Sequence, residues 1–195
     1  MPVERLTDGR VRVSTPLSDD DCRALHAGDV ALVTGVVYAA RDAAHRRMEE
    51  DVAAGRDLPF DPAGAILYYV GPTPARPGNV IGSAGPTTAS RMDRWTPMLL
   101  ERGLKAILGK GGRGPDVRRA LQEHAAVYLA ALGGGGAIAA RGVTGQRVIA
   151  YEDLGTEAVR ELTLDDFPAW VINDPAGRDF YEESREPWRR DRQSR

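Results

Sequence analysis

Three clusters of glycine constrain the fold most, because each follows directly on a short apolar segment. The clusters lie at residues 71–85, 109–114 and 133–136. The apolar segments that precede them are residues 65–70, 104–108 and 126–131. Apolar runs of this length bounded by turn residues are typical of buried strands. Glycine permits backbone conformations and close approaches that other residues disfavour, so each cluster predicts a tight loop near a ligand or a partner backbone.

The remaining pattern mixes helices and strands in one chain. After an extended segment over 1–17, Ser18 followed by three aspartates predicts a short capped helix. Longer helices are predicted over 41–54, 90–102, 115–124 and from the last glycine cluster to 140. Further strands are predicted over 29–38, 147–151, 158–164, 168–172 and, after a turn at 173–177, over 178–181. Since no internal repeat or linker interrupts residues 1–195, we expect a single domain of mixed α/β class with a charged, frayed tail over 182–195.

Charge and cysteine content exclude several classes of protein. The 26 basic and 28 acidic residues give a net charge of −2, which argues against a nucleic-acid scaffold. No segment approaches the ~18 consecutive apolar residues of a membrane span. The single cysteine, Cys22, cannot build an internal disulfide, a thiolate zinc site or an iron–sulfur cluster from this chain alone. A charged N-terminus without a signal-peptide apolar region leads us to expect a cytoplasmic location.

The hexamer Gly109–Gly114 matches G-x-G-x-x-G between a predicted strand and a predicted helix. A dinucleotide fold also needs an acidic residue ~20 positions further on, and none stands there. A phosphate-binding Walker loop fails as well, because Gly111 stands where Ser or Thr should hold magnesium. Two other interpretations stay open: a tight surface turn, or Lys110 reaching an anionic ligand beside free helix amides. Lys105 and Lys110 are the only lysines among the 26 basic residues, which hints that arginine cannot replace them.

A loop rich in glycine and proline also leads into the predicted helix at 90–102. It places Thr87 and Thr88 just before that helix and Arg91 in its first turn. A cation there opposes the helix dipole, yet hydroxyls, free amides and a guanidinium together suit an anion. The alternative is an ordinary helix start capped by Thr88 or Ser90, with Arg91 on the surface.

Near position 41, Arg41 and His45 stand one turn apart on a predicted helix and share a face. The residues alone favour a solvated charged face over a site. His26 and His124 lie near helix ends, where capping or surface roles are expected, and Asp42 with His45 makes no metal site.

Several strings in this order resemble one family. They are Arg41-Asp-Ala-Ala-His-Arg-Arg, Tyr69-Val-Gly-Pro-Thr, Gly85-Pro-Thr-Thr-Ala-Ser-Arg-Met-Asp, Leu108-Gly-Lys-Gly, Leu132-Gly-Gly-Gly-Gly-Ala, Tyr151-Glu-Asp-Leu-Gly-Thr-Glu-Ala, Asp166-Phe-Pro-Ala and Asn173-Asp-Pro-Ala-Gly. The chain is similar to the C-terminal domain of class I fumarases, the unit that forms the β subunit of two-subunit fumarases and of L-tartrate dehydratase. The resemblance covers roughly residues 18–181.

The resemblance implies a swivelling, three-layer β/β/α domain and a hydro-lyase that adds water to fumarate to give malate. It implies a 4Fe–4S cluster held by an α subunit, in an α2β2 or similar assembly whose active site this chain shares. Carried over by position, Arg41, Arg91 and Lys110 would bind the substrate carboxylates, with Thr88 beside them and Thr87 as the catalytic base. Two alternatives stay open: the β subunit of an L-tartrate dehydratase, or a non-catalytic dicarboxylate-binding protein of the same fold. None of these implies a metal ligand in this chain, a nucleic acid or a membrane.

Overall fold

The structure is a computed structural model that describes residues 2–189. Its strands are β1 (Val3–Arg5), β2 (Val11–Ser14), β3 (Val30–Ala39), β4 (Ile66–Tyr68), β5 (Ala106–Gly109), β6 (Val127–Ala131), β7 (Val143–Ala150) and β8 (Val159–Asn173). Its α-helices are α1 (Asp19–Arg23), α2 (Asp42–Ala53), α3 (Thr96–Glu101), α4 (Pro115–Glu123), α5 (Gly136–Arg141) and α6 (Phe180–Arg185). Three 3-10 helices complete it: η1 (Ala89–Met92), η2 (Glu152–Glu157) and η3 (Glu186–Trp188). The mixed α/β class expected from the sequence is confirmed.

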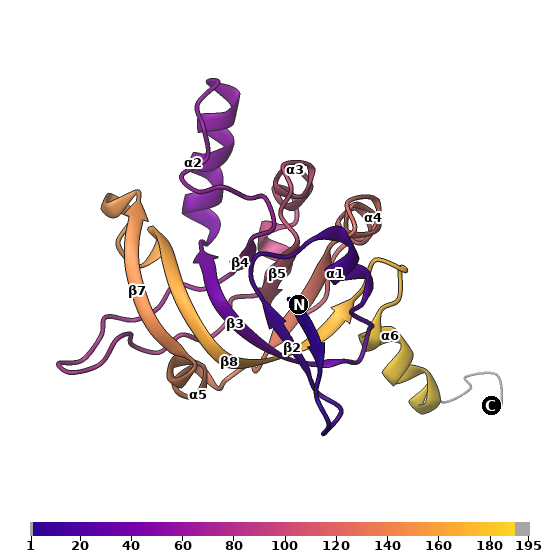
Figure 1. The fold of residues 1–195 in the computed structure, drawn as a ribbon. Helices are drawn as coiled ribbons and strands as arrows, with labels where there is room; N and C mark the ends of the chain where they lie inside the picture. The colour runs from indigo at the N-terminus through magenta and orange to yellow at the C-terminus, as the bar shows by residue number, and fades with distance from the viewer. Residues whose placement is uncertain (1, 190–195) are drawn as a thin grey trace, which may run out of the picture.

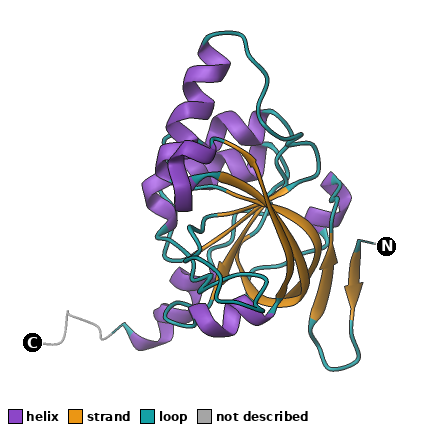
Figure 2. Cartoon of the chain, turned by 90° about the vertical axis from the view of Figure 1, so that its left-hand side faces the viewer, coloured by secondary structure: helices purple, strands orange, loops and turns teal. Residues whose placement is uncertain are grey.

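The strands form one sheet that closes on itself. Its order is β1-β2-β3-β4-β5-β6-β8-β7, and β3 also pairs with β8, so that β3, β4, β5, β6 and β8 make a ring. The strands from β2 to β6 are mutually parallel, whereas β8 runs antiparallel to β3, β6 and β7. Figure 2 shows the strands curving around this closed centre.

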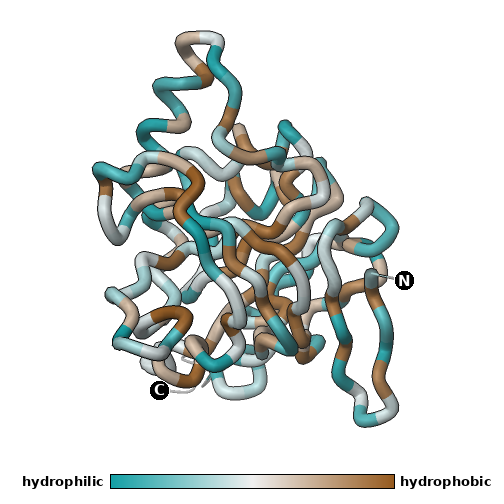
Figure 3. The backbone as a smooth tube through the Cα atoms, turned by 60° about the vertical axis from the view of Figure 1, so that its left-hand side comes forward, coloured by the Kyte–Doolittle hydropathy of each residue, from teal (hydrophilic) through white to brown (hydrophobic). Residues whose placement is uncertain are grey.

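Two hydrophobic cores lie on opposite faces of the parallel strands. Along β4 the side chains alternate: Ile66 and Tyr68 belong to the core inside the ring, while Leu67 and the next residue, Tyr69, belong to the core beneath the helices. Such strands are buried on both faces, which explains their nearly continuous apolar sequence. Helices α2, α3 and α4 cover the outer core on one side of the sheet (Figure 1), and apolar segments gather in the middle of the molecule (Figure 3). Two layers of strands, on the two sides of the inner core, and one layer of helices therefore lie one upon another.

Most predicted elements are observed, but three predictions are wrong. The helix expected over 90–102 is split into η1 and α3, because Pro97 lacks an amide hydrogen and fits only the first turn of a new helix. The strand expected over 178–181 is instead the start of α6, since the Asp179 side chain accepts hydrogen bonds from the amides of Tyr181 and Glu182. The separate strands expected over 158–164 and 168–172 are one strand, β8, with a left-handed residue, Asp166, in its interior.

The two ends of the described chain have definite structure. Residues 3–14 form an antiparallel hairpin whose second strand pairs with β3, and the capping box of Ser18 and Asp21 starts α1 as expected. The first part of the expected tail is helical, through α6 and η3, and residues 190–195 of that tail lie outside the described part of the chain. Within residues 2–189, none of the helices has the length and apolar character needed to cross a membrane.

Candidate functional site at the ends of the parallel strands

The carboxyl ends of the parallel strands β3 to β6 meet at one edge of the sheet, where α/β proteins usually bind ligands. Each of the predicted site residues follows one of these strands. Arg41 stands two residues after β3 and caps α2, which rises directly from that strand (Figure 1). Thr87, Thr88 and Arg91 follow the long loop after β4, and Lys110 follows β5 immediately.

Backbone hydrogen bonds hold the threonine loop against the lysine loop. The Thr87 amide donates to the Tyr69 carbonyl at 2.7 Å, and the Lys110 amide donates to the Thr87 carbonyl at 3.2 Å. The Ala89 amide returns to the Lys110 carbonyl at 2.8 Å, which makes Thr88 and Lys110 partners in a short parallel bridge. The structure thus places both threonines and the lysine side by side, on backbone that the neighbouring strands fix.

The two arginines lie on either side of one aspartate. Arg91 Nε donates to Asp42 Oδ1 at 2.8 Å, and Arg41 Nε lies 3.8 Å from Asp42 Oδ2. The other side of Arg41 faces Glu157, with 3.5 Å between Nη2 and Oε1. The Arg41 side chain is 23% exposed and that of Arg91 is 50% exposed, so both can reach a ligand.

Gly71, in the first glycine cluster, lies directly against the side chain of Arg41. A Cβ atom at this position would lie 2.7 Å from Cδ of Arg41, and that side chain would have to move. The Arg41 stem therefore lies across bare backbone. The glycine loop after β6 lies near Lys110 but less tightly, because a Cβ at Gly133 would contact Cδ of Lys110 at 3.7 Å, an ordinary van der Waals distance.

Beneath these loops lies a buried polar network that the sequence did not reveal. Arg113 is buried, donates from Nε to Asp93 at 2.9 Å and from Nη2 to Thr96 at 2.6 Å, and lies over the rings of Tyr69 and Tyr128. The second Asp93 oxygen accepts the Gly114 amide at 2.7 Å. This network joins the loop that carries Lys110 to the segment that carries Arg91.

Sequence reasoning also missed Asp42 and Glu157, the two carboxylates that contact the arginines. Both stand inside strings quoted for the resemblance, which was the only signal that could have singled them out. Arg41 and His45 do not act together at this site. His45 is completely buried against Tyr69 and Trp95.

The arrangement offers a dianion several donors on one surface. Two guanidiniums and an ammonium exceed the two neighbouring carboxylates by one positive charge, and the loop that bridges to Lys110 adds Thr87 and Thr88. Guanidinium groups bind carboxylates through two parallel hydrogen bonds. The geometry therefore suits a small molecule that bears carboxylates.

The described residues fit no metal or iron–sulfur cluster. No group of three His, Cys, Asp or Glu side chains in residues 2–189 could hold a metal ion. Cys22 lies in the core inside the ring, donates to the Lys105 carbonyl, and burial raises the pKa of its thiol to about 12. A thiol held protonated in this way is a poor metal ligand.

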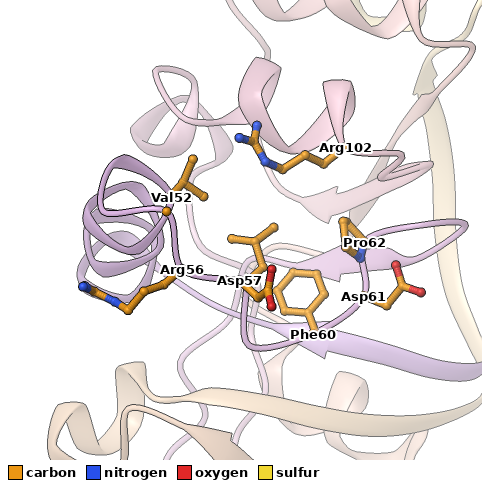
Figure 4. A pocket seen from close by; sticks show the side chains of 9 residues that line it. Val52, Arg56, Asp57, Phe60, Asp61, Pro62 and Arg102 are labelled. Atoms are coloured by element: carbon orange, nitrogen blue, oxygen red, sulfur yellow. The ribbon is translucent and has the colours of Figure 1, made fainter.

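A cavity of about 630 Å³ lies at the far end of α2, away from these residues. Val52, Phe60 and Arg102 are among its lining residues, which Figure 4 shows from close by, and none of the predicted site residues lines it. The 12 residues of α2 separate this cavity from Arg41 by about 18 Å.

Comparison with known proteins identifies the family. Residues 3–184 match the family described as Fumarase C-terminus. The chain is 37% identical over 153 residues to the class I anaerobic fumarate hydratase of Escherichia coli (strain K12), a match that covers 77% of this chain and 28% of that protein. A putative class I fumarate hydratase of Geobacillus stearothermophilus is 33% identical over 185 residues, covering 91% of this chain and 35% of that protein.

A putative L(+)-tartrate dehydratase subunit beta of Methanocaldococcus jannaschii differs in coverage. It is 35% identical over 173 residues, which are 86% of this chain and 89% of the subunit. The chain thus spans about 28% of the Escherichia coli fumarate hydratase but nearly the whole of this subunit. On the family match and these relatives, the chain belongs to the fumarase C-terminal domain family.

Proposed function

We propose that this chain is the β subunit of a two-subunit class I hydro-lyase, most simply a fumarate hydratase that interconverts fumarate and malate. The observation that carries the proposal is that Arg41 and Arg91 both pair with Asp42, while the loop of Thr87 and Thr88 bridges to Lys110, all in segments that follow the parallel strands. A relative named as a beta subunit, matched over 89% of its length, supports an α partner, and the relatives named fumarate hydratase support the reaction. We further propose that the chain acts as one domain in a cytoplasmic α2β2 or similar assembly.

The 4Fe–4S cluster typical of class I fumarases would belong to the α subunit. Cys22 is the single cysteine of the chain and is sealed inside the ring, so this chain contributes no ligand to such a cluster. Its own residues bind the substrate and move a proton.

Each side chain has a distinct part in this proposal. The arginine forks and the Lys110 ammonium hold the two carboxylates of the substrate, with Thr88 as an additional hydrogen-bond donor. Thr87 takes the proton from C3 of malate as the hydroxyl leaves C2, which gives fumarate and water, and it returns the proton to C3 when water adds its hydroxyl to C2. A threonine hydroxyl is a poor base unaided, so it depends on the positive charge of the neighbouring cations to lose its proton.

The substitution Thr87→Val tests the base. Valine keeps the shape of the loop, and Pro86 still restricts the turn, so we expect kcat in the assembled enzyme to fall by ~10²–10⁴-fold with little change in the binding of a competitive inhibitor. Thr88→Val is the matched control, expected to act mainly on binding. A Thr87→Val enzyme within a few-fold of the wild-type kcat, with equal cluster content, would eliminate Thr87 as the base.

The substitution Arg91→Lys tests the carboxylate clamp. Charge is kept, but lysine cannot make two parallel hydrogen bonds, so about 1.5–3 kcal/mol of charge-assisted binding is lost and KM rises by roughly 10–150-fold. Unchanged kinetics in the assembled enzyme would place Arg91 on an ordinary helix surface.

A second candidate function is the β subunit of an L-tartrate dehydratase, favoured by the near-complete coverage of the relative with that name. The assembled enzyme should be assayed with L-malate and with L-tartrate under the same conditions. A higher kcat/KM for malate supports the fumarate hydratase, and the reverse supports the tartrate enzyme. Binding of both without turnover would leave a non-catalytic dicarboxylate-binding protein.

A further inference from the structure

The η2 segment, taken here as Tyr151–Glu157, lies along the length of helix α2. Its Tyr151 hydroxyl donates to Asp51, and Arg47 donates to both oxygens of Asp153 at 2.6 and 2.8 Å. At its other end Glu157 Oε2 accepts the Ala43 amide at 2.9 Å. Residues 43, 47 and 51 repeat every four positions and share one face of the helix, so the segment holds α2 from end to end.

Glu157 is the contact that reaches the functional site. One of its oxygens binds the first turn of α2 through Ala43, and the other lies 3.5 Å from Nη2 of Arg41. A single carboxylate thus fixes both the backbone that carries Arg41 and the guanidinium at the tip of its side chain.

Two carboxylates face that guanidinium among the described residues, and Glu157 is the nearer one, because Asp42 Oδ2 lies 3.8 Å from Arg41 Nε. Arg41 Nε is buried and has no hydrogen-bond partner among the described residues. The stem passes over Gly71, which confines its path but offers no side chain to bind the tip. The direction in which Arg41 points therefore depends mainly on the contact with Glu157, the nearer of the two carboxylates.

We propose that Glu157 is a positioning residue for substrate binding: it keeps Arg41 aimed so that its remaining N–H groups meet a carboxylate of the substrate. The inference rests on the proposed function, because it assumes that Arg41 binds substrate. Glu157 itself does not touch the substrate. A guanidinium that is already held loses less freedom when the ligand arrives, so the effect belongs to binding rather than to the chemical step.

The test is Glu157→Gln in the assembled enzyme. Glutamine is nearly isosteric and its oxygen can still accept the Ala43 amide, but the charge that holds Arg41 is gone. We expect KM for the dicarboxylate to rise roughly tenfold while kcat stays within about threefold. The matched control is Asp153→Asn, which loosens the same segment at Arg47, away from Arg41, and should lower the melting temperature without changing KM.

A double-mutant cycle separates this inference from the proposed function. Arg41→Met should raise KM, and adding Glu157→Gln to that variant should have no further effect, because Glu157 acts through Arg41. If Arg41→Met raises KM but Glu157→Gln does not, positioning by Glu157 is overturned and the clamp stands. If Arg41→Met leaves KM unchanged, the clamp role of Arg41 fails, and the inference fails with it.

Two further outcomes would also overturn the positioning role. A lower KM in Glu157→Gln would mean that Glu157 competes with substrate for Arg41. An equal rise of KM in Asp153→Asn would mean that the segment supports the fold and has no particular effect on Arg41. Hydrogen exchange of the Ala43 amide, measured without substrate, gives a readout independent of activity: it should stay protected in Glu157→Gln, confirming that α2 is intact.

Discussion

His45 is a buried neutral base next to the candidate functional site. Its side chain is inaccessible to water, Nδ1 lies 2.8 Å from the Arg41 carbonyl, and Nε2 has no partner among the described residues. Because a carbonyl only accepts, Nδ1 must carry the proton of the neutral ring. Burial lowers the pKa of this histidine to about 4, against the raising effect of the Arg41 carbonyl and the Asp42 charge.

This histidine makes stability depend on pH. The unfolded chain takes up a proton below pH ~6.5, but the folded chain takes it up only near pH 4, so the stabilisation is complete above ~6.5 and is lost as pH falls toward 4. We expect the free energy of unfolding to be about 3 kcal/mol lower at pH 4 than at pH 7 from this group alone.

Urea unfolding between pH 7 and pH 4, compared for wild type and His45→Leu, isolates the contribution of His45. Both proteins share the acid titration of their ion-paired carboxylates, so only the difference curve reports on His45. A difference that is constant across this range would contradict a neutral, buried His45.

At the scale of elements, Lys105 links two helices that are distant in sequence. Its Nζ donates to the His124 carbonyl at the end of α4 and to Asp19 at the start of α1, each at 2.6 Å. The lysine side chain is only 13% exposed. A compact ammonium fits between these two acceptors, whereas a planar guanidinium would be too large, which explains why lysine stands here in a chain that otherwise favours arginine.

Lys105→Arg should therefore destabilise the protein although the charge is kept. We expect a loss of about 1 kcal/mol, mainly from the buried bond to the His124 carbonyl, because Asp19 is half exposed and its ion pair is weakened by solvent. The reverse exchange at an exposed pair, Arg147→Lys beside Glu161, is the control and should change stability by less than about 0.5 kcal/mol. Equal effects of the two substitutions in urea unfolding would show that Lys105 is an ordinary surface lysine.

Elements that begin with a clear capping or proline signal could be predicted, and those whose boundary one side chain changes inside a longer pattern could not. Pro115 at a helix start and the box of Ser18 and Asp21 act within one turn of the chain, and both helices were correctly predicted. The helix predicted over 90–102 breaks before Pro97 because that residue lacks an amide hydrogen, and Asp179 starts a helix in place of the expected strand through two side-chain hydrogen bonds. Neither the break before Pro97 nor the helix start at Asp179 can be predicted from the periodicity of the apolar residues.

In the candidate site, contacts between distant segments limit what the sequence predicts. Local physics set Arg91 beside Thr87 but left open whether Arg41 and Arg91 were surface charges, and only the family resemblance joined Arg41 and Lys110 to them. Glu157 meets Ala43 across 114 positions of sequence, so no pattern within one element could have joined it to Arg41. Such a contact can be identified only from the folded structure, in which these two segments lie together.

At the scale of the whole molecule, the proposed division of labour predicts an inactive isolated chain. Purified alone, it should show no iron–sulfur absorbance and no hydro-lyase activity, because its single thiol is buried and protonated. Activity should appear when an α-type subunit is added and the mixture is reconstituted anaerobically with iron and sulfide. Iron–sulfur absorbance in the isolated chain would contradict this division.

The closed ring also has a consequence for how the chain reaches its folded state. Val33 pairs with Phe167 and Tyr38 with Glu161, so β3 is made long before β8, the strand that completes the ring. Bringing such distant segments together costs chain entropy before any of their hydrogen bonds form, which slows folding. Until β8 has been synthesised, the edges of β3 and β6 that pair with it stay unpaired, and the apolar interior of the ring stays open. The partly synthesised chain without β8 is therefore the form most prone to aggregate. Its lifetime depends on how soon the ribosome releases residues 159–173.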